Sequence, residues 1–241
     1  MEERVPSCPE WTVHDLTWHV GMVYLHKTTA MQEGAEPENW PPDYDGGASA
    51  LDLIDDAYRQ LVAEFAAHDP AEASGTWYRP DQTVGFWIRR MAQETVIHRI
   101  DAELGAGERV TPVAGDLAVD GIDELLKVFV GYGVSDWPDY FTEALKDSPG
   151  RTYLITADAG ADNPGVSWLV TTSPGQFIVA GGPGERVSGT VTPDVTVSGP
   201  PTDVLRWAWN RETPGEPGQV TIGGSADALA EFRRCVVIAT Q

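Results

Sequence analysis

Several features that would assign this chain to a particular class of protein are scarce in its sequence. Only two of its 241 residues are cysteines, Cys8 and Cys235, and neither has a CxxC partner. Two isolated thiols argue against a disulfide scaffold and favour a reducing compartment. The longest apolar runs fall short of the roughly 18 residues that a membrane-spanning helix needs. The opening MEERVPSCPEW has acids where a secretory signal has a basic region, so we expect a cytoplasmic protein without a membrane partner.

Basic residues are also scarce. The chain has 16 Lys and Arg against 37 Asp and Glu, which gives a net charge of −21. A surface of this charge repels phosphate backbones and argues against nucleic-acid binding. The acids are spread evenly, with 19 acids and 7 bases in residues 1–106 and 18 acids and 9 bases in the remainder. This distribution favours a solubilising surface over an acidic tail.

The common nucleotide-binding and hydrolase motifs are missing as well. No GxSxG, P-loop or GxGxxG stands between a predicted strand and a predicted helix. The run GGPGE at 181–185 has no lysine and lies among predicted strands, so it is typical of a turn. Any catalytic chemistry must therefore come from another arrangement of side chains.

The two halves of the chain differ in composition. All five histidines lie within the first 98 residues, whereas 18 of the 25 glycines follow residue 106. Periodicity in the first half predicts three helices, at 12–31, 49–68 and 83–104, with a loop at 33–47. In the second half it predicts helices at 116–130, 201–209 and 225–237, and strands at 152–157, 166–172, 176–180, 189–197 and 220–223. We therefore predict an α+β protein with a helical domain at 1–107 and an α/β domain at 108–241.

Glu94 and His98 form the most informative pair, because four residues of helix place both side chains on one face. His19 shares a core-facing stripe with Leu16 and Val20 on the first predicted helix. Together the three residues offer a metal site with one position open, which is typical of a catalytic metal. The alternatives are a solvated Glu–His contact and a hydrogen-bonded core histidine.

Acidic neighbours stand one turn from each histidine. Asp15 precedes His19, and Asp101 follows His98. Each carboxylate would accept the second N–H of its imidazole, as is usual beside metal-bound histidines. Surface salt bridges are the alternative role for both acids.

Two long segments carry a family resemblance. VPSCPEWTVHDLTWHVGMVYLH and TVGFWIRRMAQETVIHRIDAELGAG resemble the two N-terminal motifs of the mycothiol-dependent maleylpyruvate isomerase family, and GTVTPDVTVSGPPTDVLRWAWNRE is similar to its C-terminal segment. The resemblance implies a DinB-like four-helix bundle with a divalent metal, zinc in the first place, held by His19, Glu94 and His98. It also implies a small sterol-carrier-like α/β domain. The family has a further helix before the first motif, whereas only four residues precede Val5 here.

The resemblance also implies a reaction. Mycothiol, a low-molecular-weight thiol, would add to the activated double bond of a small electrophile. In an isomerase the adduct would rotate about the resulting single bond and eliminate the thiol, whereas in a transferase the adduct itself would be released as the product. An anionic substrate needs a cationic clamp, for which Arg211 is the first candidate and Arg90 the second. A helix-end role is the alternative for Arg211. For Trp18, Trp87 and Trp209, core packing is favoured over pocket lining.

Two other functions remain open from the sequence. The same metal would activate water in a hydrolase, for instance one acting on amides. A non-enzymatic protein would instead use the second domain as a ligand carrier and the first as a scaffold. Metal content and thiol dependence separate these alternatives.

Overall fold

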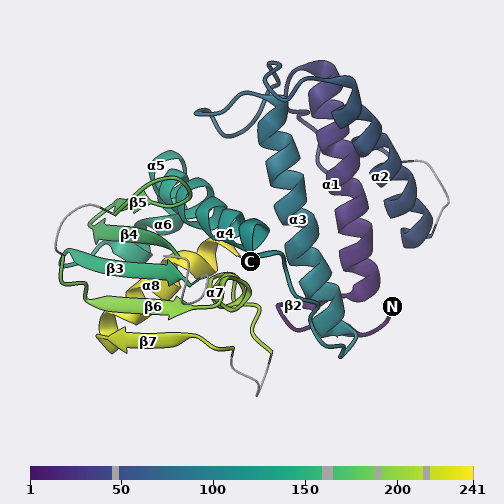
Figure 1. The fold of residues 1–241 in the computed structure, drawn as a ribbon. Helices are drawn as coiled ribbons and strands as arrows, with labels where there is room; N and C mark the ends of the chain where they lie inside the picture. Colours follow the sequence, from purple (N-terminus) through teal and green to yellow (C-terminus); the bar gives the residue numbers. More distant parts are fainter. Residues whose placement is uncertain (45–48, 159–164, 188–190, 214–217, 241) are drawn as a thin grey trace. The chain divides into compact units, whose positions relative to one another are not determined.

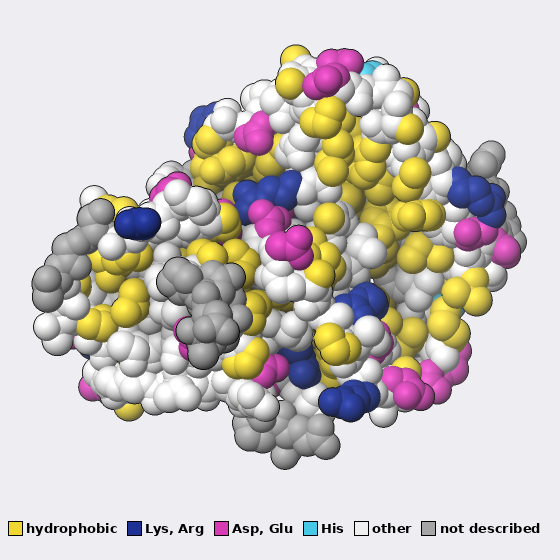
Figure 2. All heavy atoms as spheres, in the orientation of Figure 1, with side chains coloured by type: hydrophobic (Ala, Val, Ile, Leu, Met, Phe, Trp, Pro, Cys, Tyr) yellow, Lys and Arg dark blue, Asp and Glu magenta, His cyan; other side chains and the backbone are white. Residues whose placement is uncertain are grey.

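The computed structural model describes residues 1–44, 49–158, 165–187, 191–213 and 218–240 (Figure 1). The chain forms two compact units, residues 1–111 and 112–241, each with its own core. Within the described ranges, no helix is long and apolar enough to cross a membrane. On the face drawn in Figure 2, acidic side chains are scattered among hydrophobic and neutral ones. Cys8 and Cys235 are not joined by a disulfide, and burial raises the pKa of the Cys235 thiol to about 12.

The first unit consists of a short hairpin and three helices. Strands β1 (Arg4–Val5) and β2 (Cys8–Thr12) pair antiparallel, and helices α1 (Val13–Glu33), α2 (Ala50–Ala67) and α3 (Val84–Gly105) follow. The sequence predicted these helices within about two residues at each end, because their caps are local. Thr12 and Asp15 form a capping box at α1, as Ser49 and Asp52 do at α2.

Helix α1 is the central element of this unit, because it packs against both α2 and α3. Gly21 permits the close approach to α2, since a Cβ there would lie 2.8 Å from Leu53 Cγ. Leu16, Leu53, Trp87 and Ile100 are buried at the helix contacts. Burial of these large side chains provides the main driving force for the packing that brings α1 and α3 together.

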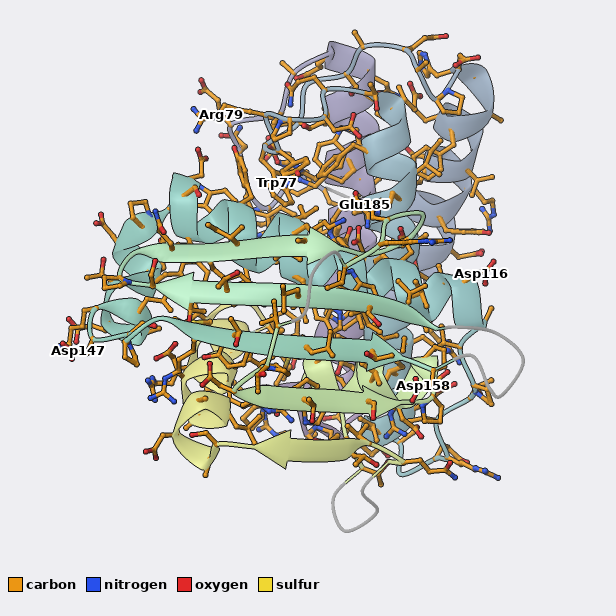
Figure 3. The ribbon with its side chains drawn as sticks, turned by 60° about the vertical axis from the view of Figure 1, so that its left-hand side comes forward. Trp77, Arg79, Asp116, Asp147, Asp158 and Glu185 are labelled. Atoms are coloured by element: carbon orange, nitrogen blue, oxygen red, sulfur yellow. The ribbon has the colours of Figure 1, made fainter. Side chains whose placement is uncertain are left out.

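The second unit is a five-stranded sheet with helices. Its strands run in the order β5-β4-β3-β6-β7, with β3 and β6 parallel and the other neighbours antiparallel. Figure 3 shows the helices of this unit behind the sheet. The bounds are α4 (Gly115–Asp123), a π-helix η1 (Glu124–Gly131), α5 (Tyr132–Asp136), α6 (Pro138–Leu145), β3 (Arg151–Ala157), β4 (Val166–Ser173), β5 (Gln176–Gly181), β6 (Val195–Gly199), α7 (Pro201–Ala208), β7 (Thr221–Gly224) and α8 (Ala226–Ala239).

The predicted combination of an N-terminal helical region with a C-terminal sheet region is confirmed. Three details differ. The hairpin before α1 and the helices α5 and α6 were not predicted; the two strands and α5 have five residues or fewer, too few to show a hydrophobic period. The helix predicted at 116–130 continues as the π-helix η1 after Asp123. The strand predicted at 189–197 begins at Val195, and residues 188–190 lie outside the described part.

Candidate metal centre

His19, Glu94 and His98 converge in the first unit. His19 projects from α1, and Glu94 and His98 project one turn apart from α3. Glu94 Oε1 lies 3.1 Å from His98 Nε2 and 3.6 Å from His19 Nε2. One ligand atom from each residue falls within 4.8 Å of the others. All three side chains are partly buried, with 26% of His19 and about half that fraction of Glu94 and His98 exposed.

These donors fit a divalent metal. Zinc accepts imidazole nitrogen and carboxylate oxygen at about 2.1 Å, which places ligand atoms of a tetrahedral site about 3.4 Å apart. The two separations from Glu94 Oε1, 3.1 and 3.6 Å, bracket that value. Two histidines and one glutamate are also the protein ligands of several catalytic zinc sites. The donor set therefore suits a metal with an open coordination position.

Arg90 supports the carboxylate of this cluster. Its Nη2 donates to Glu94 Oε2, the oxygen that does not face the histidines. Burial by itself raises the pKa of Glu94, but the charges of Arg90 and His98 outweigh it and hold that pKa well below its usual range. The carboxylate is therefore ionised at neutral pH, as a metal ligand must be.

Asp101 supports His98 from the other side. Its Oδ2 lies 3.0 Å from His98 Nδ1, and its Oδ1 accepts a hydrogen bond from the Ser7 hydroxyl. Asp101 is fully buried. Burial lowers the pKa of His98, whereas Glu94 and Asp101 raise it more strongly, to about 9, so a metal that binds His98 at neutral pH must displace a proton from its ring. The predicted Asp101–His98 contact is confirmed, and Ser7 joins the β1–β2 hairpin to it.

Replacing Asp101 by asparagine is expected to weaken zinc binding by about 10- to 100-fold, the usual effect of losing the carboxylate behind a metal-bound histidine. The asparagine keeps the size of the side chain but removes its charge. Competition with a chromophoric chelator measures the affinity. Asp116→Asn in the second unit is the control, and equal affinities for Asp101→Asn and the wild type would contradict a supporting role for Asp101.

Other residues singled out in the sequence have different surroundings. Asp15, predicted to support His19, caps α1 instead, since its carboxylate accepts from Thr12 N at 2.9 Å and Thr12 Oγ1 at 2.7 Å. Trp87 and Trp209 are core residues whose indole N–H groups donate to Gly75 O and Gly121 O. Trp18 is half-buried and packs edge-on against Tyr44.

The two arginines predicted as clamps lie in different units. Arg90 belongs to the metal cluster through Glu94. Arg211 is buried in the second unit, where its Nη1 donates to Trp209 O at 2.7 Å and Thr240 O at 2.9 Å. These two bonds join the end of α7 to the end of α8. Substrate binding by either arginine stays a prediction.

The surroundings of His19 include residues that sequence patterns missed. Trp11 of β2 and Trp40 of the loop after α1 have ring centroids 4.7 and 5.7 Å from that of His19. Ser7 also escaped notice, because its role depends on a hydrogen bond to a residue far along the chain. Trp11 stands three residues before His14 in the sequence, whereas Trp40 stands 14 residues after His26, so nothing local links Trp40 to the metal cluster.

Comparison with protein families covers nearly the whole chain. Residues 1–103 match the mycothiol maleylpyruvate isomerase N-terminal domain, and this segment contains all three residues of the metal cluster. Residues 116–231 match the corresponding C-terminal domain. A search of curated proteins finds no match. On these two matches, the chain belongs to the mycothiol maleylpyruvate isomerase family.

Proposed function

We propose that this protein is a divalent-metal enzyme that uses mycothiol to isomerise a small electrophile or to transfer the thiol onto it, with maleylpyruvate as the model substrate. The convergence of His19 with Glu94 and His98 carries the proposal. Family membership supports the choice of thiol and substrate. An isomerase and a transferase would use the same three metal ligands, so the proposal includes both reactions.

Each residue of the cluster has a part in this function. His19, Glu94 and His98 would hold the ion, zinc in the first place. When bound, the ion would lower the pKa of a thiol and so favour its nucleophilic form at neutral pH. Arg90 keeps Glu94 ionised, and Asp101 fixes the orientation of the His98 ring.

The substrate side of the proposal concerns charge. Maleylpyruvate is an anion, and the chain carries few cations. Arg211, the first candidate from the sequence for a carboxylate clamp, is buried in the second unit, where its Nη1 donates to Trp209 O and Thr240 O, so its contacts support a structural role rather than substrate binding. Arg90 is the second candidate, although its Nη2 is engaged by Glu94.

We also propose a domain assignment. Residues 1–107 would form a DinB-like metal-binding domain, and residues 108–241 a sterol-carrier-like domain. Three long helices in the first unit and a mixed sheet with helices in the second support this assignment. The described part of the first unit contains three helices, one fewer than the four-helix bundle that the resemblance implies.

The function is tested by incubating zinc-loaded protein with maleylpyruvate, with and without mycothiol, and following the products by NMR. We expect turnover only when both zinc and mycothiol are present, and none with His19→Ala. His68→Ala is the matched control, since this histidine lies on the surface and pairs with Glu64 and Glu72. Thiol-independent hydrolysis of amide substrates would support the hydrolase alternative instead. Wild-type protein without stoichiometric metal after gentle purification would contradict both enzymatic functions.

A further inference from the structure

Two tryptophans flank one metal-site histidine in the first unit. The Trp11 ring is tilted by 50° against the His19 ring at 4.7 Å, and the Trp40 ring meets it edge-on at 5.7 Å. They come from separate segments, Trp11 from β2 and Trp40 from the loop between α1 and α2. Two large aromatic surfaces therefore lie directly beside the candidate metal cluster.

Trp40 differs from the tryptophans of the core. Trp87, Trp168 and Trp207 are at most 2% exposed, whereas Trp40 is 52% exposed. A large apolar side chain stabilises the fold in proportion to the area that it removes from water, and about half of the Trp40 side chain still contacts solvent. Tryptophan that contacts a site on one side and solvent on the other is typical of binding surfaces.

The protein holds Trp40 in place rather than leaving it on a loose loop. Its ring also packs edge-on against His26, which is buried, at 5.4 Å. The loop that carries it is anchored near its start by Glu36, whose carboxylate is 2.8 Å from Lys27 Nζ. Lys27 in turn lies 4.6 Å from the centroid of the Trp87 ring in the core. Because Trp40 is already held in place, a ligand that packs on its ring loses little free energy to the ordering of protein side chains.

We propose that Trp11 and Trp40 form a subsite for the carbohydrate part of the thiol cofactor, with one sugar face packed on their rings. The proposal rests on the proposed function and adds to it the part of the cofactor that the protein recognises. Mycothiol carries its cysteine on a glucosamine–inositol unit, which is uncharged and presents C–H groups on its ring faces. Aromatic rings bind such a surface by apolar contact, without the cations that this chain has in low number.

The spacing suits this arrangement. One amide unit advances a chain by about 3.8 Å. A sugar joined through an amide to a cysteine at the cluster therefore comes within reach of rings centred 4.7 and 5.7 Å from His19. The same geometry gives a reason for selectivity, since a thiol without the sugar would leave the Trp40 surface in water.

The test compares two thiols by calorimetry on zinc-loaded protein. Mycothiol carries the sugar, and N-acetylcysteine amide carries the same acylated, uncharged cysteine without it. We expect Trp40→Ala and Trp11→Ala to weaken mycothiol binding by about 3- to 10-fold, the worth of one aromatic contact, and to leave binding of N-acetylcysteine amide unchanged. Trp137→Ala is the matched control, because this tryptophan is 38% exposed in the second unit. Zinc content and circular dichroism of each variant verify the site and the fold.

Two results would overturn the subsite. Unchanged mycothiol binding in both variants would exclude a contact with the sugar, and an equal loss for both thiols would show that the tryptophans merely support His19. Failure of the wild type to bind either thiol would contradict the proposed function separately. In that case, titration with N-acetylglucosaminyl-inositol, the uncharged sugar unit without the cysteine, decides the subsite: fluorescence quenching that Trp40→Ala abolishes supports it, and its absence refutes it.

Discussion

Exchange of Glu94 for glutamine is expected to remove the metal from this protein. Glu94 Oε1 faces both histidines, at 3.1 Å from His98 Nε2 and 3.6 Å from His19 Nε2. A neutral amide of the same shape is a far poorer ligand for zinc than a carboxylate. We expect zinc affinity to fall by more than about 100-fold, the upper end of what loss of a supporting residue costs.

The same exchange is expected to destabilise the first unit. The Arg90 side chain is 7% exposed and pairs with Glu94, which is 13% exposed. Removing the anion from a buried ion pair leaves the cation desolvated and costs about 3–5 kcal/mol. In the wild type, bound zinc would add further stability, since it binds the folded state only.

Metal analysis after gentle purification and thermal unfolding with and without added zinc measure both effects. Glu103→Gln is the matched control on the same helix. Glu103 Oε1 lies 3.1 Å from Arg99 Nη1, and Glu103 is not one of the three residues of the metal cluster. We expect this control to keep stoichiometric zinc and nearly wild-type stability. A Glu94→Gln protein that retains one tightly bound zinc would contradict the assignment of Glu94 as a ligand.

Replacing Glu231 by alanine is expected to destabilise the second unit by about 3–5 kcal/mol, which lowers Tm by roughly 10 °C. Glu231 is 3% exposed on α8. Its Oε1 accepts hydrogen bonds from Ser148 at 2.9 Å, Tyr153 at 3.0 Å and Thr172 at 2.7 Å. Its Oε2 lies 3.4 Å from Arg151 Nε. One carboxylate therefore joins α8 to two strands and to the segment after α6.

The large effect follows from what the substitution leaves behind. Removing the acceptor deprives three buried or partly buried hydroxyl groups of their shared partner, and each such loss costs about 1–3 kcal/mol. Burial and the neighbouring carboxylate raise the pKa of Tyr153, so its hydroxyl keeps its proton and acts as a donor throughout the neutral range. Alanine also leaves a cavity where the side chain was.

Calorimetry and urea unfolding of Glu231→Ala measure the loss. The control is Glu143→Ala, whose carboxylate is 80% exposed and pairs with Lys146 on the surface, so a change below about 1 kcal/mol is expected. Zinc content should stay at the wild-type level, because the metal cluster belongs to the first unit. Equal stability of the two variants would show that the Glu231 hydrogen bonds contribute nothing net to folding.

In the first unit, local sequence patterns predict where the helices begin but not every partner of the residues that cap them. Helices α1 and α2 begin within one residue of their predicted bounds, and each starts with a capping box, Thr12 with Asp15 and Ser49 with Asp52, whose residues are only three apart. The same local logic gave Asp15 a second, incorrect role beside His19. Its carboxylate is occupied by Thr12, and sequence spacing alone does not show which of two nearby partners a side chain chooses.

The sequence by itself determined the helical first half, the sheet-rich second half and the common face of Glu94 and His98. These features depend on the helix period, the strand period and turn residues, all of which act over a few positions. Only the tertiary structure placed His19 beside that pair, Ser7 on Asp101, and Trp11 and Trp40 against His19. Such contacts join segments far apart in the chain. They form because the apolar faces of α1, α2 and α3 must be buried against one another, and close packing of those faces determines which residues meet.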